Sequence, residues 1–181
     1  MTLAILVVLG TMAFSFSGTF TRQNRVSMQA NELVADLSLA RTQAAASGQF
    51  TTVCTSTSGT GCTSSNWQAG YIVFLDRNGD GVVNVSTPAQ ATDDRVLRVA
   101  AALTGNNTLA GTNLVNANRV QYRPDGLLAD FTMGSNPRMS FRITAGDRTS
   151  CYREVWVDTS GRPYAPTATQ LQNAGRSASQ C

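Results

Sequence analysis

The strongest constraint on the fold is an uncharged N-terminal stretch that runs without a break into an amphipathic pattern. Residues 2–20 (TLAILVVLGTMAFSFSGTF) carry no charge, and Arg22 and Arg25 follow directly. Eighteen helical residues span about 27 Å, close to the thickness of a bilayer's hydrocarbon core. We therefore predict that residues 1–21 are the membrane-spanning half of a helix, with these apolar side chains: Leu3, Ile5, Leu6, Val7, Val8, Leu9, Phe14, Phe16 and Phe20.

Two other interpretations of this stretch stay open. A cleaved signal peptide normally has a basic segment before its apolar one, and residues 1–20 include no basic residue. A buried core helix would normally be shorter or bounded by capping residues.

Residues 22–47 are predicted to be the amphipathic half of the same helix. Apolar side chains recur there at spacings of three, four and seven, which places them on one stripe: Val26, Leu33, Val34, Leu37 and Ala44. We expect these polar residues off the stripe: Glu32, Asp36, Arg41 and Gln43. Gly48 suits the position just after a helix end. Because residues 19–47 contain no Pro or Gly, one helix over residues 1–47 would be about 70 Å long.

After Gly48 the pattern becomes that of β-strands, so residues 48–181 are predicted to form one β-rich extracytoplasmic head. We expect strands at 50–54, 71–75, 96–99, 120–123, 139–143 and 151–157. Residues 103–118 are predicted to be loop, and residues 164–181 a tail without regular structure. The predicted fold class is α+β, with a long N-terminal helix packed on an antiparallel sheet.

The four cysteines predict disulfides in an oxidising compartment. Their number is even, their spacing is wide and no CxxC motif is present. Cys54 and Cys62 would close a short Ser/Thr/Gly-rich loop, and Cys151 and Cys181 would hold the C-terminus. We favour these two bridges over the two crossed pairings.

Composition argues against an enzyme and leaves a basic C-terminal third. The chain has no His, so it lacks the commonest general base and the commonest zinc ligand. Residues 119–181 hold eight Arg against five acidic residues, and the rest of the chain is balanced. This excess is either a phosphate-binding surface or ordinary solvated Arg. Neither a small-molecule substrate nor a cofactor is predicted.

One motif raises calcium as an alternative to no cofactor. Asp76, Asn78 and Asp80 spell the first half of a calcium loop, D-x-N-x-D-G. The twelfth position is Thr87 where the full motif needs a bidentate Glu. Asx side chains that cap their own turn explain the same spacing without a metal.

Several segments together resemble one known family. They are TLAIL, RQNR and QANELVADLSLARTQAAASGQ, then VCTSTSGTGCT, WQAGYIVFLDRNGDG, VLRV, VQYRPDGL and VDTSGR. In this order, and over nearly the whole chain, they resemble the type IV pilin-like family, specifically its GspH/FimT-type pseudopilins and minor pilins.

The resemblance implies a non-enzymatic subunit of a fibre. Such a subunit sits first in the bacterial inner membrane by a single span, with its head in the periplasm. Its partners are then other pilin or pseudopilin subunits, in a type IV pilus or a type II secretion pseudopilus. An apolar helix that leaves lipid needs another apolar environment, and a bundle of such helices provides it.

The chain departs from the family pattern at two places. The family begins with a basic leader, a cleavage Gly and an early glutamate, none of which precedes TLAIL here. We interpret the sequence as truncated at its start. FimT-type members also bind DNA through a G-R-x-R-like motif, whereas here Tyr164 replaces the second Arg after Gly161 and Arg162. DNA is therefore the alternative partner, with Arg162, Arg153 and Arg176 as candidate contacts.

Overall fold

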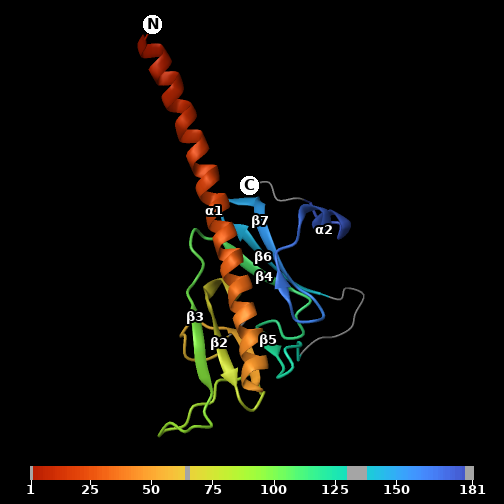
Figure 1. Ribbon diagram of the computed structural model, residues 1–181. Coiled ribbons are helices and arrows are strands. Elements are labelled where there is room, and N and C mark those ends of the chain that lie inside the picture. The colour runs from red at the N-terminus through yellow and green to blue at the C-terminus, as the bar shows by residue number, and fades with distance from the viewer. Residues whose placement is uncertain (1, 64–65, 130–137, 178–181) are drawn as a thin grey trace.

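The computed structural model describes residues 2–63, 66–129 and 138–177, and in residues 2–17 the backbone alone. One long helix, α1 (Thr2–Ser47), precedes a head of eight strands and two short helical elements within these residues. Figure 1 shows that the N-terminal part of α1 extends beyond the head, while its C-terminal part lies against both sheets.

The uninterrupted helix predicted for residues 1–47 is confirmed over Thr2–Ser47. It ends at Gly48, which adopts a φ of +65° and donates its N–H to the Ala44 carbonyl at 3.1 Å. A residue with a side chain is strained at this φ, so glycine allows the chain to leave the helix here.

The first sheet has the strand order β3-β2-β1-β5 and is antiparallel throughout. Its strands are β1 (Phe50–Thr55), β2 (Tyr71–Asp76), β3 (Arg95–Ala100) and β5 (Arg119–Tyr122). A short 3-10 helix, η1 (Trp67–Ala69), leads into β2. Each of these strands overlaps one that the sequence predicts.

The second sheet has the order β4-β6-β7-β8. Its strands are β4 (Thr108–Thr112), β6 (Met139–Ala145), β7 (Arg148–Val157) and β8 (Pro163–Tyr164). The prediction of loop throughout residues 103–118 is wrong, because β4 pairs along its whole length with β6 and buries Leu109. Tertiary pairing here outweighs the low strand propensity of the Gly and Asn residues in this segment.

The C-terminal segment also differs from its prediction as an irregular tail. It contains α2 (Ala168–Asn173), which Thr167 caps by accepting the Gln170 N–H while the Gln170 side chain accepts the Thr167 N–H. Leu171 is buried, so α2 is attached to the head.

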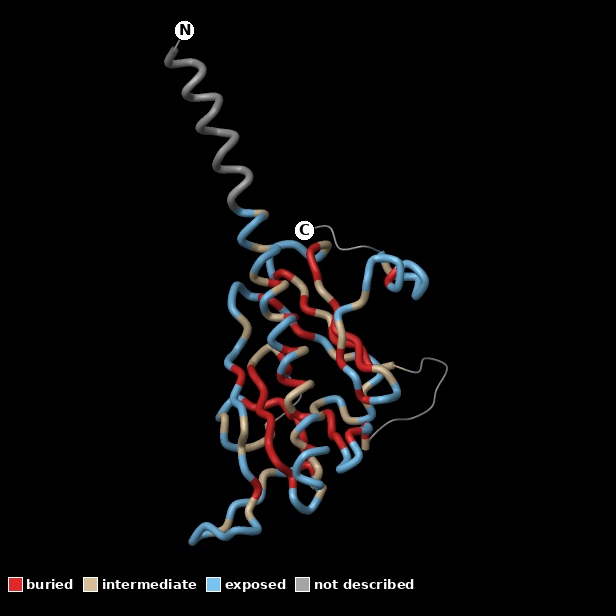
Figure 2. The backbone as a smooth tube through the Cα atoms, in the orientation of Figure 1, coloured by how far each residue is buried: buried red, intermediate tan, exposed pale blue. Residues whose placement is uncertain are grey.

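A single core lies between α1 and the inner faces of both sheets, the faces that contact the helix (Figure 2). Trp67 is buried there, with its ring centroid 5.1 Å from that of Phe141. A smaller cluster of Cys54, Ile72 and Phe74 lies on the outer face of the first sheet.

Candidate functional site

The C-terminal half of α1 anchors the helix in the head. The residues that are buried to 3% exposure or less along its inward face are Val26, Ala30, Leu33, Leu37, Ala40 and Ala44. They include most of the predicted stripe, while Val34 is half-buried. Burial of each larger side chain contributes about 1.5–3 kcal/mol to stability. The helix therefore cannot leave the head without loss of the core.

A group of polar side chains, the polar collar, links α1 to loops of the head where the helix leaves it. It consists of Arg22, Gln29, Thr104, Asn107 and Asp147. Arg22 Nε donates to both carboxylate oxygens of Asp147 at 2.9 Å, and Asn107 Nδ2 donates to Gln29 Oε1 at 2.6 Å. These hydrogen bonds from Arg22 hold the pKa of the Asp147 carboxyl below its usual range. The collar marks the level at which α1 passes from head contacts to its projecting part.

The prediction that Asp36 lies away from the packed face of α1 is wrong. It is 5% exposed, accepts a 2.9 Å hydrogen bond from the Tyr71 hydroxyl and lies 3.4 Å from Arg98 Nε. Burial raises the pKa of the Asp36 carboxyl, and Tyr71 and Arg98 offset part of that rise. Arg98 also donates to Glu32 at 2.7 Å. The hydrophobic period could not reveal this position, because its partners come from β2 and β3.

The face of α1 opposite its anchor is exposed. Residues spaced by three or four form this outward stripe: Phe20, Asn24, Met28, Asn31 and Ala35. Phe20 and Met28 are 69% and 59% exposed. Two large apolar side chains on an otherwise small and polar helix face are a candidate protein-contact surface.

No helix among the residues searched meets the length and apolarity of a membrane span. Of the residues predicted to form that span, the side chains of Leu3 to Phe16 lie outside those the structure describes.

The predicted Cys54–Cys62 disulfide is confirmed, with Cα atoms 5.6 Å apart. It fixes residues 56–63 across the outer face of the first sheet, and Cys62 packs against the cluster of Cys54, Ile72 and Phe74. Cys151 is also disulfide-bonded. Its predicted partner, Cys181, lies outside the described residues.

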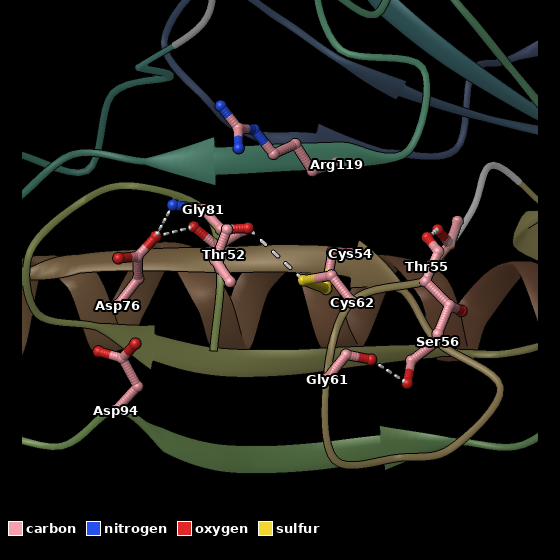
Figure 3. Close-up of a disulfide and its surroundings, with 12 residues drawn as sticks. Thr52, Cys54, Thr55, Ser56, Gly61, Cys62, Asp76, Gly81, Asp94 and Arg119 are labelled. Carbon is pink, nitrogen blue, oxygen red and sulfur yellow. Dashed lines mark hydrogen bonds between the residues drawn. A yellow bond between two sulfur atoms is a disulfide. The ribbon is translucent and has the colours of Figure 1, made fainter. Parts of the chain in front are cut away.

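The predicted calcium residues form a hydrogen-bonded turn. The buried Asp76 carboxylate accepts from Gly81 N and Thr52 Oγ1 at 2.9 and 2.7 Å (Figure 3). It also accepts from Gly79 N at 2.8 Å. Gln121 Nε2 donates to the same oxygen as Thr52 and Gly81, at 2.8 Å. Three donors around one oxygen leave it no lone pair for a cation.

The two other residues of the motif face each other. Asp80 accepts from the side-chain amides of Asn78 and Asn84, at 2.8 and 2.9 Å. In the described part of the chain, no group of three or more His, Cys, Asp or Glu could hold a metal ion. The geometry is that of an Asx-capped turn, and calcium at Asp76, Asn78 and Asp80 stays a prediction.

The family of the chain follows from its sequence. The family model described as "Type II transport protein GspH" matches residues 29–161, from the anchor of α1 to the turn before β8. The chain belongs to this family. No curated protein matches it in sequence.

Solved structures of minor pilins share the fold. The type IV minor pilin FimU of Pseudomonas aeruginosa matches with a TM-score of 0.57 at 18% identity, over 83% of this chain and 94% of that one. The minor pseudopilin EpsH of the Vibrio cholerae type 2 secretion system matches with a TM-score of 0.50 at 12% identity, over 79% and 97%. GspH-family members and these fold neighbours are structural pilins rather than enzymes.

The Gly161–Arg162 segment, which the sequence predicts as a partial DNA-binding motif, forms a hydrogen-bonded turn. Asp158 Oδ1 accepts from the backbone N–H groups of Ser160 and Arg162 and from the Ser160 hydroxyl. Although burial acts to raise it, these hydrogen bonds lower the pKa of Asp158. The turn leaves Arg162 exposed. Tyr164, in place of the second Arg, packs its ring edge-on against Trp156.

The other two candidate DNA contacts are more constrained. Arg176 donates to Glu154 at 2.8 Å, and Arg142 donates to the same carboxylate oxygen. Glu154 is 2% exposed and also accepts the Trp156 indole N–H at 2.7 Å. Arg153 is half-buried and donates to the Tyr152 carbonyl. The three Arg contact different residues among those the structure describes: Arg162 contacts Asp158, Arg153 contacts Tyr152 and Arg176 contacts Glu154.

Glu154 is the site residue that the sequence prediction missed. It lies on β7 directly opposite Arg142 of β6. An acidic residue within an Arg-rich pair of strands was the available signal, because directly opposite charges stabilise neighbouring strands.

Proposed function

We propose that this GspH-family chain is a minor pilin or pseudopilin subunit that primes or joins a type IV pilus or type II secretion pseudopilus through the N-terminal part of α1. In this proposal residues 1–21 hold the subunit in the inner membrane, residues 22–47 attach that segment to the head, and residues 48–181 form the periplasmic head. Other pilin subunits then replace lipid around α1.

The geometry of α1 is the observation that carries the proposal. One unbroken helix is anchored in the core over residues 26–44 and extends past the collar, and Phe20 and Met28 are exposed on its outward stripe. A projecting helix that is rigidly attached to a folded head can transmit position from a helical bundle to that head. Exposed apolar side chains beside the exit point favour packing against further helices.

The test is incorporation of the subunit into fibres in cells that lack the native copy. Leu6→Glu together with Val8→Glu should abolish recovery of the subunit both in membranes and in sheared fibres, because buried charges are costly in lipid and in an apolar bundle. Met28→Glu should leave membrane recovery intact and reduce fibre recovery at least fivefold.

Gln23→Glu is the matched control, since Gln23 is exposed on the same helix but outside the outward stripe. It adds the same charge and should leave both recoveries unchanged. Normal fibre recovery of the Leu6/Val8 double variant would refute assembly through this segment.

DNA binding is the second candidate function, and the exposed Arg162 on its capped turn is the observation that favours it. Contacts with phosphates weaken as salt rises, so a genuine site must bind duplex DNA at about 50 mM salt and release it near 200 mM. A mobility-shift titration of the purified chain should show this, and Arg162→Ala should weaken it. Absence of a shift at low salt would reject DNA binding.

A further inference from the structure

We propose that an open polar cavity beside α2 binds a neutral saccharide. The cavity has a volume of about 540 Å³, within the usual range for small-ligand sites. It lies between α2, the turn after β7 and the start of β6, and its lining includes Arg138, Asp158, Thr159, Tyr164, Gln170 and Asn173. The proposal goes beyond the assembly role and does not rest on it.

The floor of the cavity is held rigidly. The Arg138 guanidinium lies 4.3 Å from the centre of the Trp156 ring, and the Tyr164 ring meets Trp156 at 6.1 Å. Trp156 is itself fixed by its hydrogen bond to the buried Glu154. Cation–π stacking therefore orients Arg138 without using any of its N–H groups.

Several polar groups of the lining have no acceptor or donor elsewhere in the described chain. They are the Arg138 guanidinium, the Asn173 amide and the Thr159 hydroxyl. Gln170 uses only its carbonyl oxygen, which accepts from Thr167 N, so its amide N–H groups stay available. Asp158 similarly uses Oδ1 for its turn and leaves Oδ2 available.

The charges of the lining select the class of ligand. Arg138 and Asp158 are one cation and one anion, so the cavity is balanced overall. Asp158 places a carboxylate in the same lining as the Arg138 guanidinium, and this negative charge repels phosphate, which disfavours a nucleic-acid strand. Planar guanidinium, amide and carboxylate groups together can both donate to and accept from hydroxyls on adjacent carbons. The ring of Tyr164, which is half-buried, provides an apolar surface for the face of a sugar ring.

The experiment is saturation-transfer difference NMR on the full chain in detergent, with detergent alone as the blank. The probes are maltose, N,N′-diacetylchitobiose and a twelve-residue thymidine oligonucleotide. We expect transfer to at least one disaccharide with a Kd of about 1 mM, as suits an open polar site. Asn173→Ala should weaken that binding at least fivefold.

Gln172→Ala is the matched control, because Gln172 is an exposed neighbour on α2 that does not line the cavity. It should change the Kd by less than twofold. Near-ultraviolet circular dichroism checks that both variants keep the Trp156 environment. The proposal is overturned if neither disaccharide shows transfer, if Asn173→Ala binds as the wild type does, or if the oligonucleotide alone binds in a manner that depends on Asn173.

Discussion

The outer faces of the two sheets are closed in different ways. On the first sheet, chain close in sequence covers the face: the Cys54–Cys62 loop and the turn that the Asp76 carboxylate holds. On the second sheet, the distant C-terminal segment does so, through Leu171 and the Arg176–Glu154 ion pair.

This difference separates local from long-range stabilisation. A covalent bridge between residues eight apart orders its surroundings independently of the rest of the head. A buried carboxylate shared by two Arg requires β6, β7 and the C-terminal segment to be in place together. We therefore expect damage to the second sheet's cover to spread further than damage to the first.

Glu154→Ala should have the largest effect. It leaves the buried Trp156 indole without an acceptor and two Arg without their shared carboxylate, and should lower the free energy of unfolding by about 3 kcal/mol. Urea denaturation followed by tryptophan fluorescence measures it. Glu32→Ala is the control, since this exposed partner of Arg98 should cost less than about 1 kcal/mol. Equal losses in the two variants would show that the Glu154 cluster does not hold the second sheet's cover.

Replacement of both Cys54 and Cys62 by Ser should come next. Loop-closure entropy for a separation of eight residues predicts that the free energy of unfolding falls by about 2.5 kcal/mol. Hydrogen exchange should accelerate in residues 56–63 and 81–83 and stay unchanged in residues 168–177. Faster exchange in both regions would contradict the local character of this cover.

Asp76→Asn should lower the free energy of unfolding by about 2 kcal/mol, because the amide presents N–H groups where Gly81 N and Gln121 already donate. Thermal denaturation provides the measurement. Asp80→Asn is the matched control on the same turn, where the side chain is exposed, and we expect a change below about 1 kcal/mol. A larger effect for Asp80→Asn than for Asp76→Asn would show that Asp76 is not the carboxylate that organises this turn.

Asp36→Asn should have the smallest effect. It tests the inner side of the head, where α1 packs against the sheets. The raised pKa of Asp36 means that the folded state binds more protons than the unfolded state above pH 3.8. Its contribution to stability is full below that pH and is lost as pH rises through the folded pKa. The wild type should therefore lose stability relative to Asp36→Asn across this interval. Parallel stability–pH curves for the two proteins would exclude a raised pKa.

Sequence reasoning succeeded where the signal is local. The period of Val26, Leu33, Leu37 and Ala44, together with Gly48, located the helix and its end. The short spacing of Cys54 and Cys62 located the bridge. Each of these signals is contained within a few turns or one loop.

It failed where a distant partner determines the outcome. Leu109 is in a strand because β6 pairs with it, and Asp36 is buried because Tyr71 and Arg98 receive it. The failure to predict α2 has a different cause, because its signal is local. Thr167 and Gln170 form a capping box, which can be recognised in the sequence.

The single helix α1 also determines how the molecule bears load. Its anchored face packs against the inner faces of both sheets, with the helix axis running along the core. A pull on the projecting end along that axis would have to slide all the buried contacts of residues 26–44 at once, as shear. The strands would not be peeled away one after another, so we expect the head to resist tension along α1 better than tension applied between its sheets.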